Sequence, residues 1–242
     1  MSLIKLNAID STNDYLKQLS KIEALENFTI VMANEQTQGK GQMGAKWISE
    51  PSKNLTMSIL VTNFVLKKHT IFDLNVVTAV SILKVLQSLK IQQCKIKWPN
   101  DIMADSKKVG GILIENSLKP DGSINAIIGV GLNVNQTNFE HLPQANSLSC
   151  ITGVTYSPES IALLLKKSLQ DYLQILTKNQ DAVWDEYHQN LFKIQFPSAF
   201  EDKTGKQFMG IIQKVTRDGK LEVQLEDDSV AYFEVKELKM LY

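Results

Sequence analysis

Arginine is almost absent from this sequence of 242 residues. Of its 26 basic side chains only Arg217 is an arginine, and 26 acidic side chains balance the basic ones. Because the formal net charge is zero, the overall field gives no argument for binding to nucleic acid or to an anionic membrane. Any phosphate or carboxylate must therefore be bound by lysines, by backbone N–H groups or with a metal ion, since the bidentate guanidinium group is scarce.

Cysteine and histidine are also rare. The two cysteines, Cys94 and Cys150, have no metal-ligand spacing, so we expect both to be buried apolar residues of a cytoplasmic protein. The three histidines, His69, His141 and His188, are far apart in the sequence, so no dedicated metal site is expected. The N-terminus lacks a signal-peptide pattern and no run approaches the ~18 apolar residues of a membrane span, so the sequence predicts a soluble protein.

A glycine-rich loop is the first motif that stands out. Gly39, Gly41 and Gly44 form the pattern Gly-x-Gly-x-x-Gly, which also occurs in dinucleotide-binding loops. Such a site needs a helix directly after the glycines and an acidic residue about 20 positions later. Here Trp47 and a strand-like run at residues 55–61 follow instead, so we set aside a dinucleotide-dependent oxidoreductase.

Hydrophobic periodicity predicts a fold with both helices and strands. Ser11 and Ser157 are expected to cap two of the helices, with Asp14 completing a capping box at the first. A Pro-Asp-Gly turn at residues 120–122 is expected to join two strands in a hairpin. The expected helices cover residues 11–22, 73–90, 157–176 and 181–191, and the expected strands cover residues 28–34, 55–61, 94–98, 111–117 and 124–135.

The character of the chain changes near Pro197. Three short alternating segments follow, at residues 209–215, 220–226 and 230–235, and turn residues separate them. We therefore expect two domains, at residues 1–195 and 196–242, the second a small all-β barrel. At this size the barrel is expected to depend on the larger domain for its stability.

Five segments place polar residues or glycines where core strands would not tolerate them. They are Ser11-Thr12-Asn13, the glycine loop with Trp47, KWPND from Lys97 to Asp101, KVGGILIE from Lys108 to Glu115 and, more weakly, GVGLNVN from Gly129 to Asn135. In this order and spacing they resemble the catalytic domain of biotin–protein ligases, and the likeness runs from Ser11 to the C-terminus. KWPND together with KVGGILIE is a highly specific combination.

The resemblance implies an α+β fold of the class II synthetase-like type. Its mixed β-sheet with packed helices would carry the catalytic site, and a small SH3-like β-barrel would follow. The implied activity is ATP-dependent: biotin is activated to biotinyl-AMP and then transferred to a lysine of the biotin carboxyl carrier protein of acetyl-CoA carboxylase. Mg²⁺ is expected to arrive with ATP rather than at a metal site of the protein.

The first step of such a reaction brings a carboxylate against a phosphate, so the site must supply positive charge and N–H donors. Lys108 beside two glycines suits this, and Lys108 and Asp101 are the expected catalytic residues, although Asp101 is equally consistent with a turn-capping role. The resemblance implies that biotin is bound by Ser11, Thr12, Asn13, Gln36, Gly39, Lys40, Gly41, Gln42, Lys108, Gly111 and Leu113. It implies that the nucleotide is bound by Lys40, Gln42, Trp47, Asn100, Lys108 and Asn133.

The glycine loop departs from the family pattern. Lys40, Gln42 and Ala45 stand where the pattern has arginines. Lys40 keeps the positive charge of the arginine it replaces, as expected in a chain that nearly avoids arginine. Gln42 and Ala45 do not keep it, although a lysine could have done so at either position. The hypothesis is that the adenylate is held less tightly, or that backbone amides and Lys40 carry more of its charge.

Several alternatives remain open at this stage. A lipoate or octanoate ligase or transferase would share the fold, although its glycine-richer loop is missing here. A non-catalytic biotin-binding sensor would share the pocket, and Lys108 argues against it. Ligases that act as repressors carry a DNA-binding helix-turn-helix before the Ser-Thr-Asn segment; since only ten residues precede Ser11, no DNA binding is expected. The sequence does not distinguish a monomer from a homodimer.

Overall fold

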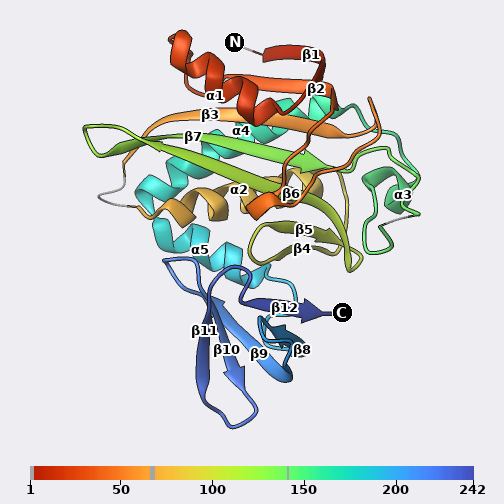
Figure 1. Cartoon of the computed structure of the whole chain (residues 1–242), viewed down its shortest axis with the longest axis vertical. Coiled ribbons are helices and arrows are strands. Elements are labelled where there is room, and N and C mark those ends of the chain that lie inside the picture. The colour runs from red at the N-terminus through yellow and green to blue at the C-terminus, as the bar shows by residue number, and fades with distance from the viewer. Residues whose placement is uncertain (1–2, 66–68, 141) are drawn as a thin grey trace.

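Two β-sheets organise the chain in the computed structural model, which describes residues 3–65, 69–140 and 142–242 and therefore not His141 (Figure 1). The larger sheet is mixed, because its first two strands are parallel and all its other neighbours are antiparallel. Its order is β1 (Leu3–Ile9), β2 (Ile30–Gln36), β3 (Leu55–Val65), β7 (Ser123–Leu132), β6 (Lys107–Leu118), β5 (Asp101–Ala104) and β4 (Cys94–Lys97). This confirms the expected α+β class.

Helices cover both faces of the larger sheet. Successive side chains of a strand point to opposite faces, so Val31, Leu60 and Ile127 pack against Leu16 of the first helix on one side. The neighbouring residues of the same strands join the main core on the other side. The helices are α1 (Thr12–Ile22), α2 (Ile71–Ser88), α3 (Leu148–Thr152), α4 (Pro158–Lys178) and α5 (Gln180–Gln189), with a short 3₁₀ turn η1 (Gln42–Gly44).

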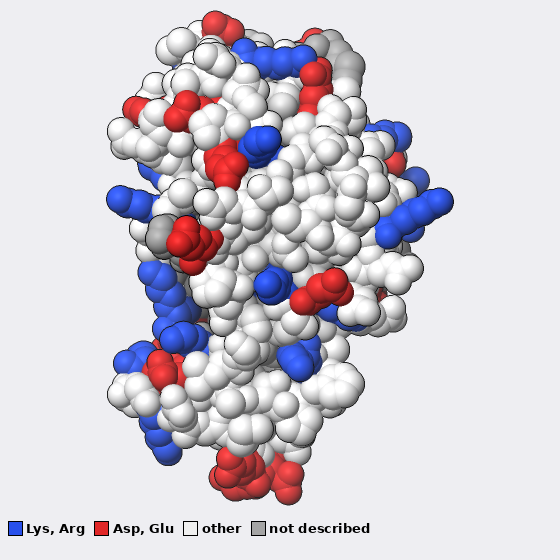
Figure 2. Space-filling model, turned by 90° about the vertical axis from the view of Figure 1, so that its right-hand side faces the viewer, with Lys and Arg blue, Asp and Glu red and all other residues white. Residues whose placement is uncertain are grey.

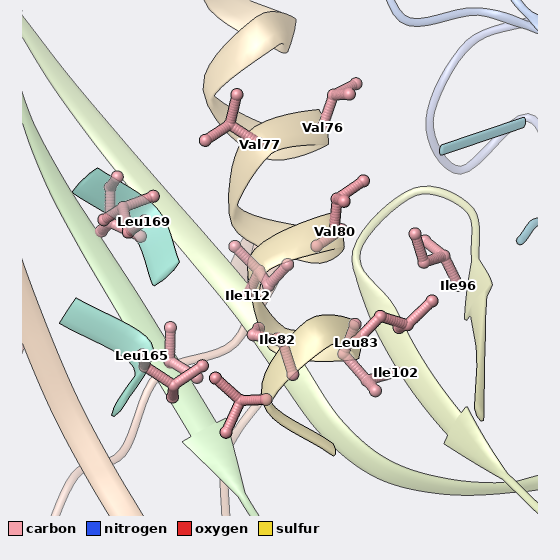
Figure 3. Close-up of a cluster of buried hydrophobic side chains, with 14 of the residues drawn as sticks. Val76, Val77, Val80, Ile82, Leu83, Ile96, Ile102, Ile112, Leu165 and Leu169 are labelled. Atoms are coloured by element: carbon pink, nitrogen blue, oxygen red, sulfur yellow. The ribbon is translucent and has the colours of Figure 1, made fainter. Parts of the chain in front are cut away.

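Helix α2 is the centre of the main core. Its side chains Val76, Val80 and Leu83 lie among residues of the sheet and of α4, as Figure 3 shows for Ile112 and Leu165. By length and composition alone, this helix could span a membrane. Since 67% of it is buried inside the fold, its apolar surface is accounted for by core packing.

The C-terminal part forms a five-stranded antiparallel sheet at one end of the molecule (Figure 1). Its order is β11 (Val230–Phe233), β10 (Leu221–Leu225), β9 (Gln207–Val215), β8 (Pro197–Asp202) and β12 (Leu238–Leu241). The β9–β10 turn contacts the segment after β4 and the start of α2. Trp98 Nε1 donates to Gly219 O at 2.9 Å, and Thr70 Oγ1 donates to Arg217 O at 2.9 Å. Gly219 must be small, because a Cβ there would lie 2.5 Å from the Phe72 ring.

The structure corrects two local expectations. Ser11 caps α1 by accepting from Asp14 N at 3.4 Å, but the Asp14 carboxylate binds Lys40 instead of completing a capping box. Cys94 is buried as expected, whereas Cys150 is exposed. On the face drawn in Figure 2, groups of both signs are interspersed, and a group of acidic side chains lies at the tip of the small sheet.

Candidate active site

A cleft of about 300 Å³ lies between the start of α1, the glycine loop (residues 39–47), strands β5 to β7 and the β11–β12 turn. Most of the residues expected from the sequence line it. These are Ser11, Thr12, Asn13, Gln36, Lys40, Gly41, Gln42, Trp47, Asn100, Asp101, Lys108, Gly111 and Leu113. Gly39 lies on the far side of the loop, in a neighbouring cavity, and Asn133 lies outside the lining.

One side of the cleft is a hydrogen-bonded wall, in which Thr12, Asn13 and Gln36 line the cleft and the buried Ser58 supports them. Thr12 donates to Gln36 Oε1 through its backbone N–H at 2.9 Å and through its hydroxyl at 3.0 Å. The hydroxyl of Ser58 lies 2.8 Å from Thr12 Oγ1 and 2.6 Å from Asn13 Oδ1. Within the described residues Gln36 Nε2 has no hydrogen-bond partner, so this amide remains available to donate to a ligand.

The wall is extended to the sheet by Asn13, whose Nδ2 donates to Glu115 Oε2 at 3.0 Å and to Leu113 O at 3.3 Å. Lys17 Nζ binds the other oxygen of the Glu115 carboxylate at 2.9 Å. Thr12, Asn13 and Ser58 are all buried, with at most 3% of each exposed. Because buried polar groups are costly when unpaired, this bonded network fixes the side chains in one arrangement.

Two glycines of β7 make room for the side chains above the sheet. Residues two apart on a strand share a face, and here Gly129 and Gly131 face the cleft. A Cβ at Gly129 would overlap Asn13 Oδ1, and one at Gly131 would lie 2.5 Å from the Trp47 ring. These positions therefore need glycine for the close approach of Asn13 and Trp47.

The glycine loop forms the opposite side of the cleft. It folds back on itself, with Trp47 N donating to Gly39 O at 2.9 Å and Gly41 N donating to Ala45 O at 2.7 Å. The N–H group of Gly41 is therefore used inside the loop. The Trp47 Nε1 group is buried and has no partner among the described residues.

Lys40 ties the start of the loop to α1. Its Nζ lies 2.6 Å from Asp14 Oδ2, and this hydrogen bond raises the pKa of Lys40 above its usual value. Both side chains are partly exposed, so the pair is expected to contribute less than about 1 kcal/mol. The loop is thus held by few contacts compared with the hydrogen-bonded wall.

The floor of the cleft carries a charged pair. Lys108 Nζ of β6 lies 2.5 Å from Asp101 Oδ1 of β5, and Lys97 Nζ lies 4.0 Å from the other oxygen of Asp101. Burial lowers the pKa of Lys97. The Lys108 ammonium group also lies 5.9 Å from the centre of the Trp47 ring. One carboxylate is therefore shared by two lysines at the base of the cleft.

Two expected nucleotide-binding amides support the backbone. Asn100 lines the cleft, but its Nδ2 donates to Ile112 O at 2.7 Å. Asn133 is buried and its Nδ2 donates to Asn146 O at 3.1 Å. The second amide therefore holds a neighbouring loop and does not face the cleft.

Sequence reasoning missed Ser58 and Lys236. Ser58 could have been found, because a hydroxyl in the apolar run LTMSILV has to find a partner. Lys236 reaches the cleft from the small sheet, and no local pattern indicates this. Among the described residues, no group of three or more His, Cys, Asp and Glu residues is arranged to hold a metal ion.

The fold of this chain is similar to that of biotin protein ligases whose structures have been solved. The biotin protein ligase from Aquifex aeolicus, solved in complex with biotin and ATP, superposes with a TM-score of 0.81 at 24% identity and covers 99% of this chain and 98% of that one. The enzyme from Leishmania major, solved with biotinyl-5-AMP, gives a TM-score of 0.64 at 22% identity over 97% of this chain and 99% of that one. These likenesses concern the fold.

Comparison of sequences gives the family. Residues 6–135 match the model of the biotin/lipoate A/B protein ligase family, and the chain belongs to this family. The bifunctional ligase/repressor BirA of Bacillus subtilis is 30% identical over 193 residues, which are 76% of this chain and 59% of that protein. The chain thus spans about three fifths of the length of this curated relative.

Proposed function

We propose that the protein is an ATP-dependent biotin–protein ligase. It activates biotin to biotinyl-AMP and transfers biotin to a lysine of the biotin carboxyl carrier protein of acetyl-CoA carboxylase. The observation that carries the proposal is the Lys108–Asp101 pair, 2.5 Å apart, on the floor of a cleft that five separate sequence motifs line. A Mycobacterium tuberculosis relative, 25% identical over 79% of this chain and 71% of its own length, is named biotin–[acetyl-CoA-carboxylase] ligase.

The reaction has two displacements. A carboxylate oxygen of biotin bonds to the α-phosphorus of ATP, and the bond from this phosphorus to the bridging oxygen breaks, so pyrophosphate leaves. Lys108 supplies positive charge beside the oxygens of the biotin carboxylate and of the α-phosphate, which come close together in this step. The amine of the acceptor lysine then attacks the carbonyl of the mixed anhydride and loses a proton, while AMP leaves with the bonding electrons. Asp101 orients the incoming amine.

We assign biotin to one side of the cleft and the nucleotide to the other. The neutral ring system of biotin lies against the hydrogen-bonded wall, where the free Nε2 of Gln36 donates to it and Ser11 borders it. The nucleotide lies towards the glycine loop, near Trp47, Lys40 and Gln42. Asn133 has no direct part in this assignment, because its amide is engaged with Asn146 O.

Mg²⁺ fits this site as a companion of ATP. Asp101 is the single carboxylate among the described residues that line the cleft, which suits an ion held mainly by phosphate oxygens. When bound, the ion would offset part of the negative charge of the phosphates. We also place the protein in the cytoplasm. The support is that Cys94 and Cys150 are both free thiols.

A transfer assay tests the proposal. The protein is incubated with ATP, Mg²⁺, biotin and a biotin carboxyl carrier domain, and the carrier is analysed by intact-mass spectrometry. We expect a gain of one biotin that needs ATP, and a loss of about 10²–10³ in rate for Lys108→Ala, by analogy with removing one oxyanion donor. Biotin binding without any gain would indicate a sensor. A gain only with lipoate would place the protein in the other branch of its family.

A further inference from the structure

A turn of the small sheet touches the tip of the glycine loop. Lys236 Nζ, in the β11–β12 turn, donates to Met43 O at 2.7 Å, although the two residues are 193 positions apart. Val235, Lys236 and Leu238 complete the lining of the cleft from this side. The small sheet therefore takes part in the active-site cleft through this one turn.

The turn that carries Lys236 is itself well fixed. Glu237 accepts from Glu234 N at 3.0 Å and donates its own N–H to Glu234 O at 3.1 Å, and its carboxylate binds Lys203 Nζ at 3.0 Å. Lys236 has a φ of 70°, a left-handed conformation that a non-glycine residue keeps only when its surroundings hold it. The lysine therefore starts from a defined position.

The tip of the loop, in contrast, depends on this contact. Among the described residues, Lys236 Nζ is the single group outside the loop that hydrogen-bonds to residues 41–45. Met43 is 58% exposed and so does not anchor the tip in the core. Within the described part of the chain no carboxylate lies at ion-pair distance from Lys236, whereas Lys40 and Lys108 each bind one. No other described group pairs with the ammonium group of Lys236.

We propose that Lys236 is a positioning residue that holds the glycine loop over the cleft and thereby slows the escape of the acyl-adenylate intermediate. The inference rests on the proposed ligase function. A hydrogen bond from a charged donor to a carbonyl must break before the loop tip can move away. This contact is placed where the loop has Gln42 and Ala45 in place of charged side chains.

Two measurements test this role with Lys236→Met, which keeps the length of the side chain but removes its donor and charge. The first is amide hydrogen exchange of residues 39–47 in the protein without substrates. The second is the rate at which biotinyl-AMP leaves its complex. We expect both to rise about threefold to tenfold, and tenfold corresponds to about 1.4 kcal/mol.

Two further variants serve as controls. Lys239→Met makes the same change three residues away, at a lysine whose side chain is 73% exposed and does not contact the loop. It should leave both rates unchanged. Lys236→Arg should restore loop protection, because arginine can donate to the same carbonyl.

Equal loop exchange in Lys236→Met and Lys239→Met would overturn the role of Lys236. So would faster release in both variants, which would indicate an effect of charge alone. If the protein forms no biotinyl-AMP, the proposed function fails, but the exchange measurement still decides whether Lys236 holds the loop. A general loss of folding is recognised because it raises exchange in β7 as well as in the loop.

Discussion

The two sides of the cleft are built in different ways. Thr12, Asn13 and Ser58 of the hydrogen-bonded wall are buried, and their polar atoms bind one another and the neighbouring strand. The glycine loop is partly exposed and is bound to the rest of the protein near its ends and through Met43 O. A preformed wall loses little entropy when it binds a rigid neutral ring. A loop held by few contacts can open for entry and close over a charged intermediate.

Adding one methyl group on each side of the cleft tests whether the two sides differ in rigidity. Gly129→Ala places a Cβ against Asn13 Oδ1 and 3.1 Å from Leu113 O, in the part of the site that cannot give way. We expect it to lower the free energy of unfolding by about 1–3 kcal/mol. Gly131→Ala meets the Trp47 ring on the loop, which can move, so its cost should stay below about 1 kcal/mol. Urea denaturation of both variants measures this, and equal losses would mean that the two sides are equally rigid.

A smaller effect is expected from breaking the hydrogen-bonded wall at its centre. Ser58→Ala removes the hydroxyl that contacts Thr12 and Asn13 and leaves one of their oxygens short of a donor. The expected cost is about 1–2 kcal/mol in unfolding free energy, together with weaker biotin binding in titration calorimetry. Ser49→Ala is the matched control, since no described residue hydrogen-bonds to the Ser49 side chain, and it should change stability by less than about 0.5 kcal/mol. An unchanged biotin affinity in Ser58→Ala would show that the wall does not depend on this hydroxyl.

The smallest expected effect comes from restoring charge to the loop. Gln42→Arg supplies a guanidinium group that can bind the phosphate of the adenylate with two hydrogen bonds. We expect biotinyl-AMP to dissociate about threefold to tenfold more slowly. Gln38→Arg adds the same charge outside the cleft lining and should have no such effect. If release is not slowed, Lys40 and the backbone amides already supply the binding that the missing arginines would give.

Local patterns in the sequence predicted the parts of the fold that have local causes. The β6–β7 hairpin follows from its Pro-Asp-Gly turn, and α1 and α4 begin next to the serines expected to cap them. Strand β1 was missed because it is a half-exposed edge strand whose pairing with β2 is parallel and non-local. Strand β5 was missed because its four residues directly follow a turn.

In the candidate site, too, the sequence predicted only the features that have local causes. The motif residues of the cleft were predicted because each motif lies within a few positions, and the cleft brings the motifs together. The Asn133 amide was assigned to the nucleotide from its motif, but which way it points depends on the loop that ends near Asn146. The contact between Lys236 and Met43 depends on how the small sheet docks, through Trp98 and Gly219. No short-range pattern carries that information.

The position of Trp47 also gives the protein an optical probe of its own cleft. Trp184 is buried outside the cleft lining and its indole N–H is bound to Asp73, so the emission of this ring should change little during the reaction. The Trp47 ring lies against Gly131, and its N–H has no partner among the described residues. Its fluorescence should shift when a nucleotide enters or the loop opens, so that loop motion can be followed in real time without a label.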